Sequence, residues 1–198
     1  MGDRGRRDLP LAVETRDDAV NRELERSVLA WIAAYWNAGH LVSTREWALR
    51  LAPEASEALE IAALTHDMER HFPGGPELDM SRQRPDDEVY NRDHSERSAL
   101  IVGEFLHGEG AAPELVAEVE RLIRAHEFGG WYEADVLQAA DSLSWLEVNQ
   151  DVARRWVRDG RCDVDWAREK HRWSFERIQL EEARELARPY YEEALASV

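Results

Sequence analysis

The chain has 198 residues, a length that suits one domain with a hydrophobic core of its own. It carries 25 basic against 41 acidic residues, a formal charge of −16, so it repels polyanions and nucleic acid is not an expected partner. The single cysteine, Cys162, excludes an internal disulfide, and no apolar run approaches the roughly 18 to 20 residues that cross a bilayer.

The first residues of the chain are polar. The start, MGDRGRRDLP, lacks the apolar stretch of a secretory signal, so we expect a cytoplasmic protein without membrane partners. Residues 1–17 mix Arg, Asp, Pro and Gly with little apolar periodicity, and we expect them to form a flexible arm. The remainder, 18–198, is predicted to be one domain, present as a monomer or a homodimer.

From Asp18 onward, apolar residues recur at steps of three and four, which is typical of amphipathic helices. Strand signals are absent, so the predicted fold class is all-α, a bundle of about six to seven helices. The first helix is predicted from Asp18 to a stop at Asn37–Gly39, and the others at about 40–52, 54–72, 93–107, 112–127, 132–159 and 163–196.

One predicted connection, from Pro73 to about Arg92, is long for a loop between helices of a compact domain. It carries Arg82, Arg84 and Tyr90 within a few residues. Loops of this length are either lids and binding segments or disordered insertions, and both interpretations stay open.

Six ionisable residues fall on the apolar faces of the predicted helices, because residues three and four positions apart share one side of a helix. His94, for example, shares a stripe with Ile101 and Phe105. The six residues are His40, His66, Asp67, His94, His126 and Asp141.

Such residues need a common partner in the interior. Burial of a charge or an unpaired polar group costs several kcal/mol unless it is compensated, and metal ions can compensate all six groups at once. Imidazole and carboxylate ligands suit divalent iron, manganese, cobalt, nickel or zinc, whereas the absence of thiolates argues against a cysteine-type structural zinc site. The sequence therefore predicts a buried metal centre.

The order of these residues resembles the HD-domain metal-dependent phosphohydrolase superfamily. Its minimal signature is a His, a His-Asp pair and a distant Asp, which here are matched by His40, by His66-Asp67 in ALTHDMER and by Asp141 in LQAADSLSWLE. The resemblance covers about residues 20–150 and implies an HD-domain-like helical bundle.

His94 and His126 fall where the dinuclear branch of that superfamily adds two histidines. The resemblance therefore implies two divalent metal ions, with Fe or Mn favoured and Zn, Co or Ni possible. It implies one ion held by His40, His66, Asp67 and Asp141, and a second held by His94 and His126, with Asp67 bridging. A pair of ions can share a hydroxide and clamp an in-line displacement at phosphorus. This implies hydrolysis of a small phosphorylated metabolite or nucleotide.

The chain departs from the superfamily pattern after the His-Asp pair. Many hydrolytic members have a Gly-Lys there, whereas this chain has Glu69-Arg70. Arg70 can still grip a phosphate with two donors and is, with Asp67, a predicted catalytic residue. Glu69 is expected to add negative charge beside it, which disfavours a small, highly anionic substrate.

Lys170, the only lysine in the chain, is the third predicted catalytic residue. With Ser174 and Arg177 it lies on one side of the predicted last helix, where the three residues can close over the pocket as an anion clamp. Surface ion pairing with Glu181 is the alternative.

Three charged residues, Glu96, Arg97 and Glu127, lie beside His94 or His126 in the sequence. Each is either a partner that orients an imidazole or part of a solvated helix surface. Both interpretations stay open for all three.

Among the other aromatic residues, Trp145 and Trp173 fall at core spacing and are expected to pack in the interior. Trp131 and Tyr132 follow a Gly-Gly pair close to the fifth predicted helix and are expected at a pocket mouth. His171 lies in a charged segment and is expected to have an ordinary structural role.

Two other functions stay open beside phosphoester hydrolysis. The same six ligands in the same order resemble those of di-iron oxygenases of the myo-inositol oxygenase-like and phosphonate-cleaving type. A non-catalytic module that keeps its metal for folding is the third hypothesis.

Overall fold

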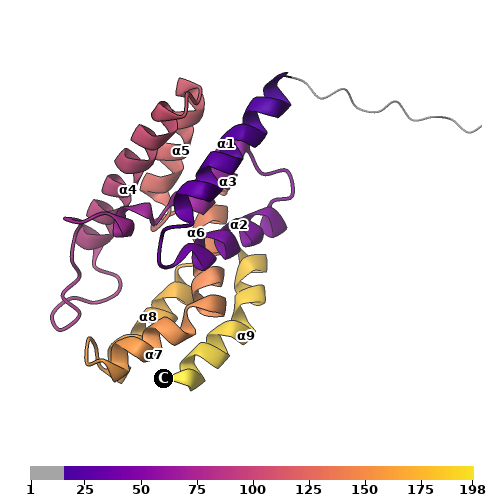
Figure 1. The fold of residues 1–198 in the computed structure, drawn as a ribbon. Coiled ribbons are helices and arrows are strands. Elements are labelled where there is room, and N and C mark those ends of the chain that lie inside the picture. Colours follow the sequence, from indigo (N-terminus) through magenta and orange to yellow (C-terminus); the bar gives the residue numbers. More distant parts are fainter. Residues whose placement is uncertain (1–15) are drawn as a thin grey trace, which may run out of the picture.

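In the computed structural model, residues 16–198 of the chain are described. Over this range the protein forms nine α-helices, one 3-10 helix and no strand, which confirms the predicted all-helical bundle (Figure 1). The helices are α1 Arg16–Ile32, α2 Ala38–Leu51, α3 Glu57–Thr65, α4 Glu88–Gly108, α5 Pro113–Ala125, α6 Tyr132–Val148, α7 Gln150–Arg158, α8 Val164–Glu176 and α9 Glu181–Ser197, and the 3-10 helix η1 is Met68–His71. The predicted flexible arm, residues 1–17, lies outside the described range except for its last two residues.

Helix ends place two of the predicted ligands. The Ser56 hydroxyl caps α3 by accepting from the Leu59 amide at 3.2 Å, and the same helix ends with His66 as its C-cap residue. Helix α5 ends in the same way with His126. Gly129, at φ +71°, then turns the chain toward α6 through the left-handed region that favours glycine.

The centre of the bundle is built around α3 and α6. Helix α3 contacts α1, α2, α5 and α6, while α2 packs across α6 and α4 packs along α5 (Figure 1). Leu59 and Leu64 of α3, Ile123 of α5, and Leu137 and Leu143 of α6 are almost completely buried. Each such side chain contributes about 1.5–3 kcal/mol through burial. Helices α7, α8 and α9 pack against α6 on the other side.

Besides the predicted helix 54–72, which divides into α3 and η1, two segments predicted as continuous helices are each divided. The segment 132–159 breaks at Asn149, where α6 ends and the chain turns so that α7 packs on α8. The segment 163–196 breaks after Glu176, where Arg177 turns into the site and Ile178 is fully buried. The second break lets α9 fold back along α8 and α6.

Helix α4 begins earlier than the apolar pattern predicted. The Asp87 side chain caps it by accepting from the Tyr90 amide at 2.8 Å, so the long loop spans residues 72–87. In the described part of the chain, no helix has both the length and the apolar character that crossing a membrane requires.

Candidate metal centre

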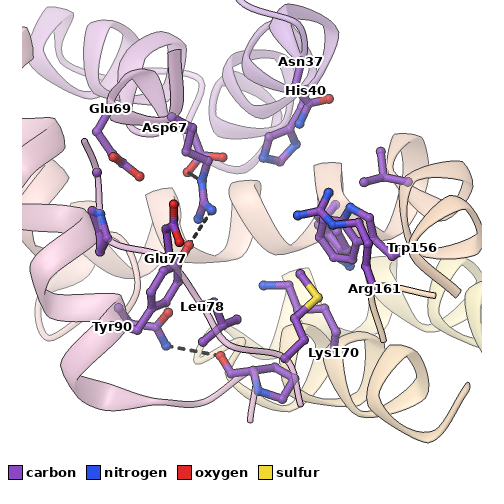
Figure 2. Close-up of a pocket in the computed structure, with 18 of the residues that line it drawn as sticks. Asn37, His40, Asp67, Glu69, Glu77, Leu78, Tyr90, Trp156, Arg161 and Lys170 are labelled. Atoms are coloured by element: carbon purple, nitrogen blue, oxygen red, sulfur yellow. Dashed lines mark hydrogen bonds and ion pairs between the residues drawn. The ribbon is translucent and has the colours of Figure 1, made fainter. Parts of the chain in front are cut away.

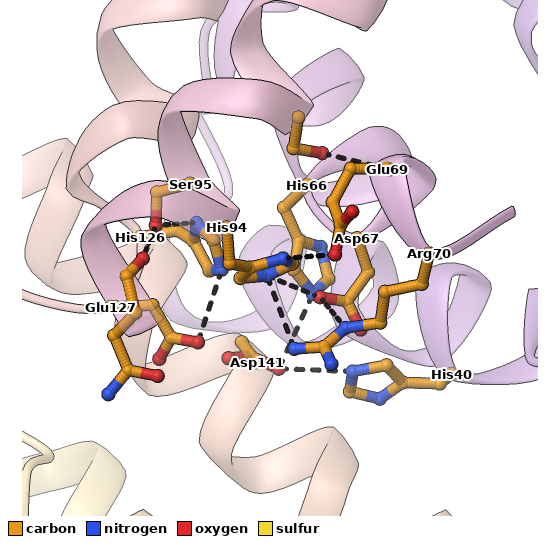
Figure 3. Close-up of polar contacts among 12 residues, drawn as sticks. His40, His66, Asp67, Glu69, Arg70, His94, Ser95, His126, Glu127 and Asp141 are labelled. Carbon is orange, nitrogen blue, oxygen red and sulfur yellow. Dashed lines mark hydrogen bonds and ion pairs between the residues drawn. The ribbon is translucent and has the colours of Figure 1, made fainter. Parts of the chain in front are cut away.

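The six predicted ligands converge from α2, α4, α6 and the carboxyl-terminal ends of α3 and α5 (Figure 3). All of them lie in or at the edge of the interior. The exposed fractions are 0% for His66, His94 and His126, 3% for His40, 7% for Asp141, and 13% for the Asp67 side chain.

The two histidines at helix ends are oriented by backbone carbonyls. His66 Nδ1 lies 3.1 Å from the carbonyl oxygen of Ala63, and His126 Nδ1 lies 2.7 Å from that of Ile123. The last carbonyls of a helix have no amide partner within it, so they are free to accept from an imidazole N–H. Both rings therefore donate through Nδ1 and direct Nε2 into the site.

The other two histidines are oriented by side chains. His94 Nδ1 lies 2.8 Å from Glu69 Oε1, a carboxylate that can only accept. His40 Nδ1 lies 2.8 Å from Ser144 Oγ, and that hydroxyl already donates to the His40 carbonyl at 2.9 Å. His40 must therefore donate to Ser144, which again makes Nε2 the inward-facing atom.

The Nε2 atoms of His40 and His94 each face a carboxylate oxygen. The distance is 3.0 Å from His40 Nε2 to Asp141 Oδ1 and 2.9 Å from His94 Nε2 to Asp67 Oδ1. A lone pair repels a carboxylate oxygen at this range unless a proton or a metal cation lies between them. The arrangement is therefore complete only with added positive charge.

The Nε2 atoms of His66 and His126 are buried and make no hydrogen bond. His66 Nε2 lies 3.4 Å from Asp141 Oδ1, and His126 Nε2 lies 3.6 Å from Glu127 Oε1. Burial lowers the pKa of His126, so at neutral pH this ring is uncharged and keeps its inward lone pair. Two orphaned imidazole nitrogens in a fully buried position fit metal ligation, because a metal ion is the partner that they lack.

Asp67 belongs to two sets of donor atoms. In each set, three donor atoms lie within 4.8 Å of one another. The sets are His40, His66 and Asp67, and Asp67, His94 and His126. A carboxylate shared in this way has the placement that a bridging ligand requires.

Two guanidinium groups also balance the buried carboxylates. Arg177 binds Asp141 and Glu127, and Arg70 Nε lies 3.1 Å from Asp67 Oδ1. Burial raises the pKa of both aspartates, but the neighbouring cations more than offset it and hold each pKa well below its usual value. The sequence suggested that metal ions alone balance the buried carboxylates. In the structure, arginines share that role.

Glu69 has a role that the sequence did not predict. Its carboxylate is 2% exposed and is held between His94 Nδ1 and Arg97 Nη1, at 2.8 Å from each. Its charge is balanced by Arg97 and it orients the imidazole, as carboxylates beside metal-ligating histidines do. Glu69 also adds negative charge near Arg70, as expected, and so helps to raise the pKa of that guanidinium, which neighbouring Asp67 raises more strongly.

Lys170 and His171 both contact tryptophan side chains. Lys170 Nζ lies 4.2 Å from the Trp173 ring centroid and 5.0 Å from that of Trp145, and burial lowers the pKa of Lys170 to about 8. His171 is fully buried, and its Nδ1 accepts from Trp145 Nε1 at 3.3 Å. Burial, with repulsion from Lys170, lowers the pKa of His171 to about 4.

A cavity of about 810 Å³ opens onto the cluster (Figure 2). Its lining includes His40, Asp67 and Asp141 together with Arg70 and Lys170. The three predicted catalytic residues, Asp67, Arg70 and Lys170, therefore face the same cavity. This arrangement is able to receive an anionic ligand beside the cluster.

The loop 72–87 forms one wall of the cavity. Trp166 Nε1 donates to the Gln83 carbonyl at 2.9 Å and ties the loop to α8. A Cβ at Gly75 would lie 2.3 Å from Glu69 Oε2, so only glycine lets the loop approach this carboxylate so closely. Of the two interpretations of the loop, a binding segment fits these contacts.

Sequence reasoning left Glu127 undecided. The side chain is buried, binds Arg177, and forms a third donor set with His126 and Asp141. The sequence did contain a signal for this role, because Glu127 directly follows the histidine that ends α5. Glu96 is instead exposed and pairs with Arg124, as a surface residue does.

The aromatic residues follow the prediction only in part. Trp145 is buried in the core as expected and also lines the cavity, whereas Trp131 and Tyr132 are not part of the lining. Trp131 lies instead under Arg121, whose Cζ is 4.2 Å from the ring centroid. Tyr90 from α4 adds a contact that spacing did not reveal, because its hydroxyl accepts from Arg70 Nη1 at 2.7 Å.

The described residues thus combine four inward imidazoles and two carboxylates with a cavity that carries Arg70 and Lys170. Imidazole and carboxylate donors together suit a divalent transition metal. No protein-family model, curated protein or solved structure matches this chain significantly.

Proposed function

We propose that this protein is a metal-dependent phosphohydrolase of the HD-domain type that acts on a small phosphorylated metabolite or nucleotide. The observation that carries the proposal is the convergence of four Nδ1-anchored imidazoles on two carboxylates beside a cavity whose lining includes Arg70 and Lys170. When bound, two divalent ions, Fe or Mn in preference to Zn, Co or Ni, supply the Lewis acidity that activates water at neutral pH and neutralises phosphoryl charge.

The donor sets suggest how the ligands are divided. His40, His66 and Asp141 hold one ion, and His94 and His126 hold the other, with Asp67 between them. Asp67 lies in two of the three donor sets and joins the histidines of both, which supports a bridging role. All six residues that the proposal uses as ligands lie at the cluster (Figure 3).

Arg70 is the residue best placed to orient the substrate phosphate. Its guanidinium touches Asp67 through Nε, Tyr90 through Nη1 and His94 through Nη2, so it is fixed at the cavity wall. A planar guanidinium binds two phosphate oxygens at once. We assign to Arg70 the part that the Lys of the Gly-Lys pattern has in related hydrolases.

Lys170 supplies a second positive charge on the α8 side of the cavity. Burial lowers the pKa of Lys170 to about 8, so its side chain is charged at neutral pH and loses its proton at moderately alkaline pH. The group can therefore bind phosphate oxygens, and it can also give a proton to the leaving oxygen of the ester.

The test uses full-length protein purified without a metal-binding tag. Its metal content is measured first, and phosphate release and oxygen uptake are then followed on a panel of phosphorylated metabolites, nucleotides, phosphonates and polyols, with Asp67→Asn as the inactive control. Phosphate release that is insensitive to oxygen supports the proposal. Oxygen consumption with an iron pair would identify an oxygenase instead. If bound metal raises stability but neither reaction occurs, the protein is a non-catalytic module that keeps its metal for folding.

A further inference from the structure

The cavity is much larger than its cluster requires. Pockets of about 300–1,000 Å³ hold whole drug-sized ligands, and this cavity measures about 810 Å³. A phosphate group beside the cluster fills only a small part of that space. The remaining lining residues therefore indicate what kind of substrate body the cavity can hold.

An aromatic wall lines the part of the cavity formed by α6, α7 and α8. The ring centroids of Trp145 and Trp156 are 5.6 Å apart, and those of Trp156 and Trp166 are 6.1 Å apart. Trp166 is held in place by its hydrogen bond to Gln83. Apolar side chains from the loop and from α7 complete this lining, namely Leu78, Met80, Pro85 and Val152. Such a wall favours a flat, apolar ligand body.

Two arginines beside this wall have no ion-pair partner. Among the described residues, no carboxylate lies within 4.0 Å of Arg155 or Arg161, although both line the cavity. Arg161 Cζ lies 5.6 Å from the Trp156 ring centroid. In Figure 2, Trp156 and Arg161 stand across the pocket from Glu77, which also lines it.

One carboxylate of the cavity lining, Asp159, is already paired with another arginine. Asp159 lines the cavity, but it accepts from Arg158 Nε at 2.9 Å. This hydrogen bond lowers the pKa of Asp159, and the charges of Arg155 and Arg161 add to the effect. Three arginines thus act on one aspartate, and neither Arg155 nor Arg161 has an ion pair of its own among the described residues.

We infer that the substrate is a phosphomonoester with a flat apolar body and a second anionic group at its far end. The inference rests on the proposed phosphohydrolase activity. The ester phosphate lies at the cluster, the body packs on Trp156, and the distal anion is bound by Arg155 and Arg161. Hydrolysis breaks the phosphorus–oxygen bond to the body and forms one to the water oxygen, which releases inorganic phosphate and the hydroxyl compound, with the proton passing to the leaving oxygen.

The test compares phenyl phosphate with 4-carboxyphenyl phosphate and the longer 4′-carboxybiphenyl-4-yl phosphate. Affinity is measured by calorimetry on metal-loaded full-length protein, and phosphate release is measured in parallel. We expect at least one carboxylated probe to bind about tenfold more tightly than phenyl phosphate, because charge-assisted hydrogen bonds strengthen binding by about this factor. A bisphosphate of the same body shows whether carboxylate or phosphate is the preferred distal anion.

The double variant Arg155→Gln/Arg161→Gln should lose this preference and bind phenyl phosphate as before. The matched control is Arg154→Gln/Arg172→Gln, which removes two ion-paired arginines, one from α7 and one from α8, that do not line the cavity. All four positions are exposed, so folding should be unaffected.

The two proposals can fail separately. Phosphate release from phenyl phosphate, with no gain from any distal anion or with equal losses in both double variants, overturns the inference and keeps the hydrolase. An arginine-dependent gain in affinity without phosphate release from any probe supports the distal anion subsite and overturns the hydrolase.

Discussion

Arg177 binds one carboxylate oxygen of Asp141 and leaves the other, Oδ1, to face the histidines. Its Nη2 bonds to Asp141 Oδ2, its Nη1 bonds to Glu127, and its Nε donates to Ser142 Oγ at 2.8 Å. Oδ1 then lies 3.0 Å from His40 Nε2. Arg177 is a positioning residue, because it fixes the rotation of a carboxylate at the cluster.

Arg177→Gln should destabilise the metal-free protein by about 3–5 kcal/mol, because it leaves two buried carboxylates without their cation. Chemical denaturation in the presence of a chelator measures this. Added Mn²⁺ should recover part of the loss, since the metal supplies the missing charge. Arg172→Gln on the adjacent helix α8 is the control, because its exposed pair with Glu169 at 3.6 Å should matter little. Equal effects of the two substitutions would contradict the role of Arg177.

Asp67→Asn and Asp141→Asn should differ in metal stoichiometry. Asp67 lies in the donor set of His40 and His66 and in that of His94 and His126, so its loss should remove both ions, whereas loss of Asp141 should leave the ion at His94 and His126. Metal analysis after gel filtration measures the equivalents retained. Asp93→Asn, an exposed position on α4, should keep both ions. Two equivalents retained by Asp67→Asn would refute a shared ligand.

Glu69→Gln should weaken metal binding by about 10- to 100-fold, the range for partners that orient a ligating histidine. The amide can still accept from His94 Nδ1, but it cannot balance Arg97. Titration with a competing chelator measures the affinity. Glu96→Gln on α4 removes an exposed carboxylate paired with Arg124 and should leave the affinity unchanged. An unchanged affinity in Glu69→Gln would show that Glu69 only supports the fold.

His171 should make the protein less stable as the pH falls. Burial and repulsion from Lys170 lower its pKa from 6.5 to about 4, so the unfolded chain takes up a proton between these values that the native protein excludes. The free energy of unfolding should therefore decrease as the pH drops through this window, by up to about 3 kcal/mol.

His171→Asn keeps an acceptor for Trp145 Nε1 and removes the titrating group. Denaturation at several pH values, with a chelator present, should show a smaller loss of stability between pH 6.5 and 4 in this variant. The other acidic and histidine groups are common to both proteins and cancel in the comparison. Parallel pH profiles would contradict the assignment.

Helical periodicity was sufficient to predict the all-helical fold and the inward faces of residues such as His94. It was not sufficient for contacts that depend on breaks in helices. The segment between α8 and α9 contains no Gly or Pro, so nothing in it signalled the break that turns Arg177 toward Asp141. The pairing of Glu69 with His94 was equally hidden, because it joins η1 to α4 across the bundle.

The helix-end placement of His66 and His126 has a consequence for assembly. Each of these imidazoles is aimed by the last turn of its own helix, yet their partners arrive from α2, α4 and α6. The two donor sets that share Asp67 each draw on segments far apart in the chain. Metal affinity should therefore depend on how closely α2, α3, α4, α5 and α6 pack together. A substitution far from every donor that loosens this packing should lower the metal affinity.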